Sequence, residues 1–196
     1  MSDATLPRQL DDGRRVDRGR AGMACLILTE SAFFAIFVVA YLFYIGKSVT
    51  GPQPVDVLDF PVVGTVALLS SSGTIMFAVR ALRRGEIARF IASFLVTITL
   101  GVVFLVSTAM EWNRLIFEDG LTIGTNLFGT TFYSLVGFHA AHVCIGILLM
   151  SGIWSMTLLG HVKSRHAEKV ELVSWYWHFV DAVWLVVLTS VYIVGL

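Results

Sequence analysis

Five long apolar stretches constrain what this chain can fold into. They cover about residues 21–46, 60–82, 88–112, 127–159 and 172–195. Each exceeds the ~20 residues that an α-helix needs to cross the hydrocarbon layer of a membrane. Only 14% of the 196 residues are charged, against about 25% in soluble domains. The sequence therefore predicts an all-α integral membrane bundle of five transmembrane helices at 21–196, preceded by a polar tail at 1–20.

Lysine and arginine are distributed unevenly between the connecting segments. Twelve of the fourteen lie in the N-terminal tail, in the loop after the second stretch and in the loop after the fourth, and the other two are Lys47 and Arg114. Positive residues concentrate on the cytoplasmic side of a membrane. We therefore expect a cytoplasmic N-terminus and a C-terminus on the outer side. The net charge of zero offers no basic surplus for nucleic acid.

Glu30 lies inside the first apolar stretch, about 13 Å from its start at 1.5 Å per residue. A charged residue in mid-membrane costs about 2.5–3.5 kcal/mol, so such groups usually face protein or water. Phe33 and Phe37 follow at helical spacing on a similar face. This pattern leaves two interpretations open, a functional or lipid-contacting carboxylate and a structural hydrogen bond.

The last stretch contains SWYWHFVDAVW at 174–184, which places His178 and Asp181 three residues apart. Residues at this spacing lie on one helix face, so we expect the histidine to be the partner of the aspartate. The pair predicts a structural contact between helices, with a proton relay as the alternative.

His139 and His142 are also three apart, in GFHAAH. One such pair without a third ligand is weak support for a metal or haem site, and Gly137 and its small neighbours favour close helix contact with hydrogen bonds across it. We predict no catalytic residue and no metal site. Cys25 and Cys144 show no ligand spacing and are expected to be buried.

In combination, these motifs resemble subunit III of the haem–copper terminal oxidases in its five-helix bacterial form, which lacks two N-terminal helices of longer versions. The resemblance rests on GMACLILTESAFF (22–34), EWNRLIFEDGLT (111–122), FGTTFYSLVGFHAAHV (128–143) and Glu171 followed by WYWHFVDAVW (175–184). Two departures are GFHA in place of the family's GFHG, and Met156 where some members carry a lipid-binding arginine.

The resemblance implies a non-catalytic subunit of a cytochrome c oxidase. Such a subunit packs on subunit I, neighbours subunit II and other oxidase subunits, holds phospholipid, and supports proton uptake and stability during turnover. Haem and copper would be bound by the partner subunits and not by this chain.

Residue by residue, the resemblance implies two groups of positions. Lipid or proton-uptake support would come from Glu30, His139, His142, His178 and Asp181. Helix packing and interfaces would involve Phe33, Phe37, Glu111, Gly137, Glu171, Trp177 and Trp184.

Three alternatives stay open. The resemblance also allows a quinol oxidase or nitric oxide reductase complex, which would use a homologous subunit, and the residues alone leave two further interpretations. An independent proton-coupled transporter would use Glu30 and Asp181 as carriers, and broken helices would favour it. A cytochrome b-like enzyme fits the number and placement of histidines poorly.

Overall fold

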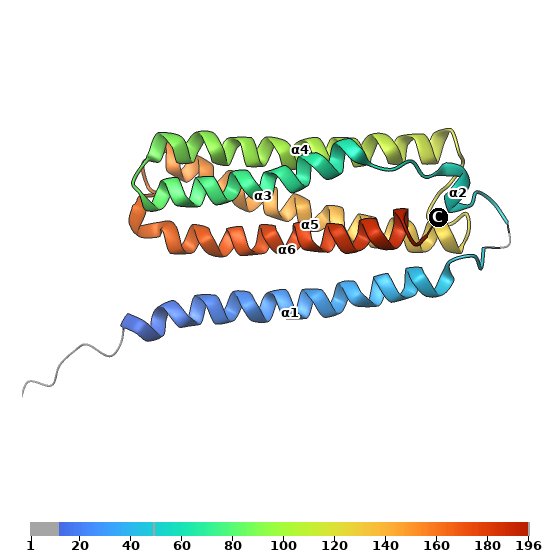
Figure 1. The fold of residues 1–196 in the computed structure, drawn as a ribbon, viewed down its shortest axis with the longest axis horizontal. Coiled ribbons are helices and arrows are strands. Elements are labelled where there is room, and N and C mark those ends of the chain that lie inside the picture. Colours follow the sequence, from blue (N-terminus) through green and yellow to red (C-terminus); the bar gives the residue numbers. More distant parts are fainter. Residues whose placement is uncertain (1–11, 49, 196) are drawn as a thin grey trace, which may run out of the picture.

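The computed structural model describes residues 12–48 and 50–195, and the long elements in these ranges are all helices (Figure 1). The long helices are α1 (Asp12–Tyr44), α3 (Val62–Arg83), α4 (Ile87–Phe117), α5 (Leu127–Leu158) and α6 (Ala167–Tyr192), with a short α2 (Pro54–Val57) and the 3₁₀ turn η1 (Ser164–His166). Five helices are long and apolar enough to cross a membrane. The prediction of an all-α chain with five spans is confirmed.

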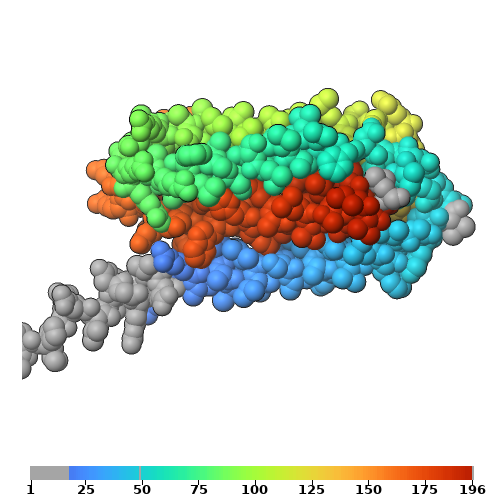
Figure 2. Space-filling model, in the orientation of Figure 1, coloured from blue at the N-terminus to red at the C-terminus, as the bar shows by residue number. Residues whose placement is uncertain are grey.

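Helices α3 to α6 form a four-helix bundle in which each helix packs against the next and α6 closes the ring against α3. Helix α1 lies outside this ring, along α5 and α6 (Figures 1 and 2). Between Arg18 and Tyr44 its buried side chains are Phe34 and Tyr41. The first span is therefore attached along one narrow stripe, and most of its surface faces outward.

Three helices extend well beyond the apolar stretches that predicted them. Helix α1 begins at Asp12, so part of the expected polar tail is helical, α4 continues to Phe117, and α6 begins at Ala167. The additional turn of α4 is held by the linker before α3. Arg114 donates a 2.6 Å hydrogen bond to the carbonyl of Val57 and forms an ion pair with Asp59. Polar contacts with the linker, and not burial in lipid, stabilise this end of α4. The hydropathy of the sequence therefore did not predict it.

Left-handed glycines follow α3 and α5, the two spanning helices that end at the same end of the bundle. Gly85 follows α3 with φ +78° and Gly160 follows α5 with φ +75°. The amide of Glu86 bonds back to Ala81 and that of His161 to Met156, the pattern that satisfies the last carbonyls of a helix when the next residue is left-handed. Both turns lie at the end of the bundle that carries the arginine-rich α3–α4 loop, called the basic end below.

The outer surface of the bundle is apolar, with outward-facing residues on every spanning helix. Because apolar side chains are stable in hydrocarbon, this surface suits lipid or the apolar face of a partner. Cys25 and Cys144 are both exposed on it. The expectation that they are buried is wrong, because α1 and α5 bury only the face turned toward their neighbours.

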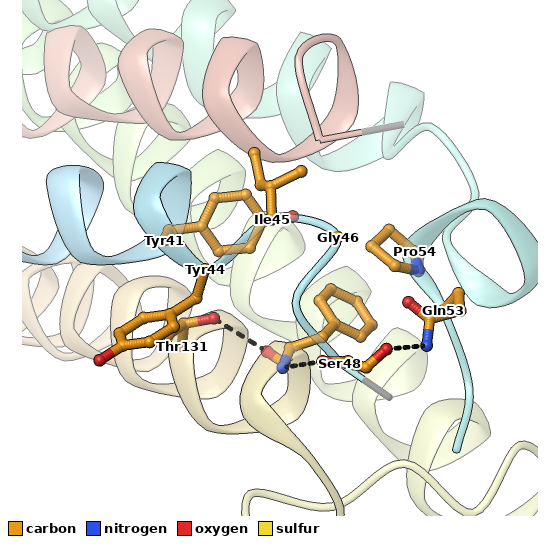
Figure 3. Close-up of a pocket in the computed structure, with 9 residues that line it drawn as sticks. Tyr41, Tyr44, Ile45, Gly46, Ser48, Gln53, Pro54 and Thr131 are labelled. Atoms are coloured by element: carbon orange, nitrogen blue, oxygen red, sulfur yellow. Dashed lines mark hydrogen bonds between the residues drawn. The ribbon is translucent and has the colours of Figure 1, made fainter. Parts of the chain in front are cut away.

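At the opposite end, the α1–α2 linker folds onto the start of α5. The side-chain oxygen of Asn126 accepts from the amide of Gly129 at 2.8 Å and so caps α5, while its amide nitrogen donates to the carbonyls of Thr50 and Pro52. Ser48 contacts both Gln53 and the first turn of α5, beside Tyr41 (Figure 3). The hollow between them measures about 10 Å³, which is space for roughly one water and excludes a larger ligand.

We expect Asn126→Ala to lower the free energy of unfolding by about 1 kcal/mol, because the helix cap is lost. Asn126→Asp keeps the capping oxygen and loses the two donated bonds, so it should fall between alanine and wild type. The thermal denaturation midpoint in detergent measures both. The matched control is Asn113→Ala, an exposed asparagine of α4, and equal midpoints for Asn126→Ala and Asn113→Ala would contradict the assignment.

Candidate functional site

Glu30 on α1 contacts His142 on α5. One carboxylate oxygen lies 3.2 Å from Nε2 of the histidine, and Nδ1 of the same ring lies 2.9 Å from the carbonyl of Phe138. A carbonyl only accepts, so Nδ1 carries a proton and donates it. The contact between Nε2 and the carboxyl group then requires a second proton, held by the histidine in an ion pair or by Glu30 in a neutral pair. Glu30 and His142 therefore share one proton between the carboxyl group and Nε2.

The Glu30 side chain keeps 29% of its surface exposed, whereas the His142 side chain keeps 9%. Aromatic rings cover the histidine side of the pair. The ring of Phe138 packs against those of Phe33 and Phe37 with centroids 4.9 and 5.2 Å apart, and Phe34 lies 5.0 Å from the imidazole. The phenylalanine stripe of the first span therefore packs α1 onto α5 beside the carboxylate.

A second polar cluster joins α3 to α6, and its geometry corrects one prediction. Ser72 of α3 lies between His178 and Asp181 and bonds both, at 2.9 Å to Nδ1 of the histidine and through a donated bond to Oδ2 of the aspartate. Ser174 contacts Nε2 of His178 at 3.2 Å. The partner of Asp181 is thus a serine on another helix, and not the histidine one turn away. A directed chain runs from Ser174 through His178 and Ser72 to Asp181.

His139 does not share the role of His142. It is fully buried, and neither of its ring nitrogens has a hydrogen-bond partner within the described residues. Its ring stacks on Trp184 with centroids 5.2 Å apart and meets the edge of Phe104. Of His139 and His142, His142 alone bonds another helix within the described residues, so the prediction that both do so is half right.

Trp177 and Trp184 of α6 fill the centre of the four-helix ring. Their indole nitrogens donate to hydroxyls of α3, Trp177 to Ser71 at 2.8 Å and Trp184 to Thr65 at 3.1 Å. A methyl group on Gly146 would lie 2.7 Å from the Trp177 ring, and one on Gly101 would lie 2.9 Å from it. The indole therefore occupies a slot that only two glycines leave open. A methyl group on Gly137 would lie 3.2 Å from the Trp112 ring, so this glycine also leaves room for an indole edge.

The two remaining predicted carboxylates join helices near the ends of the bundle. Tyr192 of α6 donates to Glu111 of α4 at 2.9 Å. At the basic end, Arg83 of α3 pairs with Glu171 of α6. Glu111 thus tethers helices across the bundle, a contact that its place beside Trp112 in the sequence did not indicate.

Sequence reasoning missed the hydroxyl residues of α3 that serve these contacts. The run LLSSSGT at 68–74 consists mainly of small residues, and its spelling is equally typical of a close-packing helix face. Ser71 and Ser72 bond Trp177 and the His178–Asp181 cluster, and Thr74 bonds Thr97 of α4 at 2.7 Å. Three consecutive serines inside a membrane helix were the available signal, because hydroxyls there form bonds between helices.

The carboxyl and imidazole groups of these contacts can hold and exchange protons, and all of the contacts fix helices to one another. Within residues 12–48 and 50–195, no group of three His, Cys, Asp or Glu side chains could hold a metal ion. The polar sites are separate pairs and chains between helices.

Residues 11–196 match the family described as cytochrome c oxidase subunit III. The relatives include cytochrome c oxidase subunit 3 of Lemur catta, which is 35% identical in an alignment of 184 positions that covers 88% of this chain and 65% of the lemur protein. The Homo sapiens protein of the same name is 35% identical over 88% of this chain and 68% of its own length. The chain thus spans about two thirds of the length of these relatives.

Proposed function

The chain belongs to the cytochrome c oxidase subunit III family, and from that premise we propose that it is a non-catalytic accessory subunit of a respiratory haem–copper oxidase. In this proposal it lies in a bacterial inner membrane with a cytoplasmic N-terminus, packs on subunit I of an aa3- or caa3-type enzyme, and holds phospholipid. Haem and copper are bound by the partner subunits.

The observation that carries the proposal is the Glu30–His142 pair. It places a proton holder inside a membrane span, on the α1–α5 seam. Since intramembrane ionisable residues usually mark proton or substrate pathways, the pair supports a role in proton uptake for the oxidase. The uninterrupted helices α1, α3, α4, α5 and α6 lack the breaks typical of a transporter's central site.

The test of assembly is to purify the tagged full chain in mild detergent. Haem in stoichiometric amount together with a large polytopic subunit is the expected result, and oxidation of reduced cytochrome c by the preparation identifies the electron donor. A colourless protein that purifies alone under these conditions would overturn the proposal.

We expect Glu30→Gln to leave the haem spectrum and the initial rate of oxygen uptake close to wild type, and to shorten the time over which activity is sustained. The glutamine amide group can still bond Nε2 of His142, as donor or as acceptor, a bond worth about 1 kcal/mol, but it cannot exchange a proton. The measurement is oxygen consumption over many turnovers.

The matched control is Glu118→Gln, which removes an exposed carboxylate at the end of α4. Loss of the haem signal in Glu30→Gln would show that Glu30 is needed for assembly. Sustained activity equal to that of Glu118→Gln would refute the proton role.

A further inference from the structure

A cavity of about 400 Å³ lies between the end of α3 and the start of α4, at the basic end of the bundle. Its charged lining consists of Arg80, Arg84, Arg89 and Glu86, and its apolar lining includes Phe77. Glu86 already pairs with Arg89 at 2.7 Å. This α3–α4 cavity therefore has three guanidinium groups and a single carboxylate, which is engaged.

Arg80 and Arg84 have no ion pair or hydrogen bond to any side chain in the described part of the protein, and both are exposed. The guanidinium of Arg80 lies 5.9 Å from the ring centre of Phe77, which orients it over the apolar wall. Arg83, on the intervening turn, is engaged by Glu171 and does not line the cavity. Two unengaged guanidinium groups thus face one hollow, a geometry suited to an anionic group such as phosphate.

The position of the cavity selects the kind of anion. It lies where α3 ends after 22 apolar-rich residues, which at 1.5 Å each match the ~30 Å hydrocarbon thickness. Outward-facing apolar residues of both helices continue from it toward the middle of the membrane, among them Met76, Leu95 and Val96. Gly73 leaves open space on the same hairpin. A ligand with a phosphate head and apolar chains satisfies both surfaces.

Two other cavities suit an anionic headgroup less well than the α3–α4 cavity does. A cavity of about 330 Å³ at the opposite end has Asp59 and Glu111 in its lining, and its single arginine, Arg114, is engaged by Asp59. A cavity of about 250 Å³ beside Met156 has Lys169 as its one permanent cation. The α3–α4 cavity has the largest positive excess of the three.

We propose that the α3–α4 cavity binds the headgroup of an anionic phospholipid such as phosphatidylglycerol, with Arg80 and Arg84 on the phosphate and the acyl chains along the α3–α4 flank. The inference deepens the lipid-holding part of the proposed function by naming the site and the charge class of the lipid. A zwitterionic lipid is disfavoured, because its ammonium group would meet the same arginines.

The test is native mass spectrometry of the whole complex released from nanodiscs that contain phosphatidylglycerol and phosphatidylcholine in equal amounts. Wild type should retain phosphatidylglycerol in preference to phosphatidylcholine. Arg80→Gln/Arg84→Gln should weaken that retention by at least about tenfold, since both charge-assisted contacts to the phosphate are lost.

The control Arg20→Gln/Arg165→Gln removes two exposed arginines outside the cavity and should retain lipid as wild type does. An equal loss of retained phosphatidylglycerol in both double variants would indicate a general attraction between basic residues and anionic lipid, and would overturn the proposed site. Unchanged retention in Arg80→Gln/Arg84→Gln would overturn it too, even if the cavity bound inorganic phosphate.

If the glutamine variant does not assemble, Arg80→Lys/Arg84→Lys replaces it. This variant keeps both charges and loses the planar forks that bind phosphate in pairs of bonds, so retention should fall part of the way, and wild-type retention would count against the site. The measured mass also separates the two proposals. If the chain retained anionic lipid but carried no oxidase partners, the lipid site would be supported and the proposed function would be overturned.

Discussion

Trp177→Ala is expected to lower the free energy of unfolding by about 3–5 kcal/mol, the range for deleting a large buried aromatic side chain. The ring is fully buried, and it fills the slot that Gly101 and Gly146 leave open. In a membrane, helices associate through packing and hydrogen bonds, because lipid offers no hydrophobic drive between them. The cavity and the loss of the bond from Trp177 to Ser71 therefore both destabilise the bundle, although the Ser71 hydroxyl keeps its bond to the carbonyl of Leu68.

The matched control is Trp175→Ala, two residues earlier on the same helix. Trp175 is 37% exposed, so its removal deletes a ring of the same size without opening an internal cavity. The thermal denaturation midpoint of the purified complex in detergent should fall sharply for Trp177→Ala and little for Trp175→Ala. Comparable midpoints for the two variants would show that the slot around Trp177 does not determine stability.

The five spans were predictable because span length and apolarity are properties of each stretch by itself. Their precise ends were not, since Arg114 extends α4 through contacts with residues more than fifty positions away. The exposure of Cys144 was missed for a related reason. Hydropathy identifies a helix as membrane-spanning and says nothing of which face turns toward its neighbours.

The candidate site was predictable in its members and not in their pairing. Glu30 and His142 both stood out as polar groups in apolar helices, but they are 112 residues apart, and only the rotation of α1 against α5 brings them together. For Asp181, the local rule of residues three apart on a helix favoured His178. The structure places Ser72 between them instead, because a helix face directed at a neighbour meets that neighbour's side chains.

Ser72→Ala should be the most damaging small substitution in α3, since it removes one oxygen and disconnects the chain from His178 to Asp181. One oxygen of Asp181 already lacks a partner among the described residues, and the other accepts from Ser72. Without that bond the buried carboxyl group has no partner there at all. The expected cost is about 1–3 kcal/mol if the group takes up a proton and about 3–5 kcal/mol if it stays charged.

A double-mutant cycle tests whether this cost arises from the cluster. Asp181→Leu combined with Ser72→Ala replaces the bonded pair by apolar groups, which is often close to neutral, so the double variant should be more stable than Ser72→Ala alone. Ser70→Ala, at an exposed serine of the same helix, is the control and should match wild type in its thermal midpoint. Strictly additive losses in the double variant would show that Ser72 and Asp181 act independently, and the α3–α6 chain would then be a coincidence of geometry without energetic coupling.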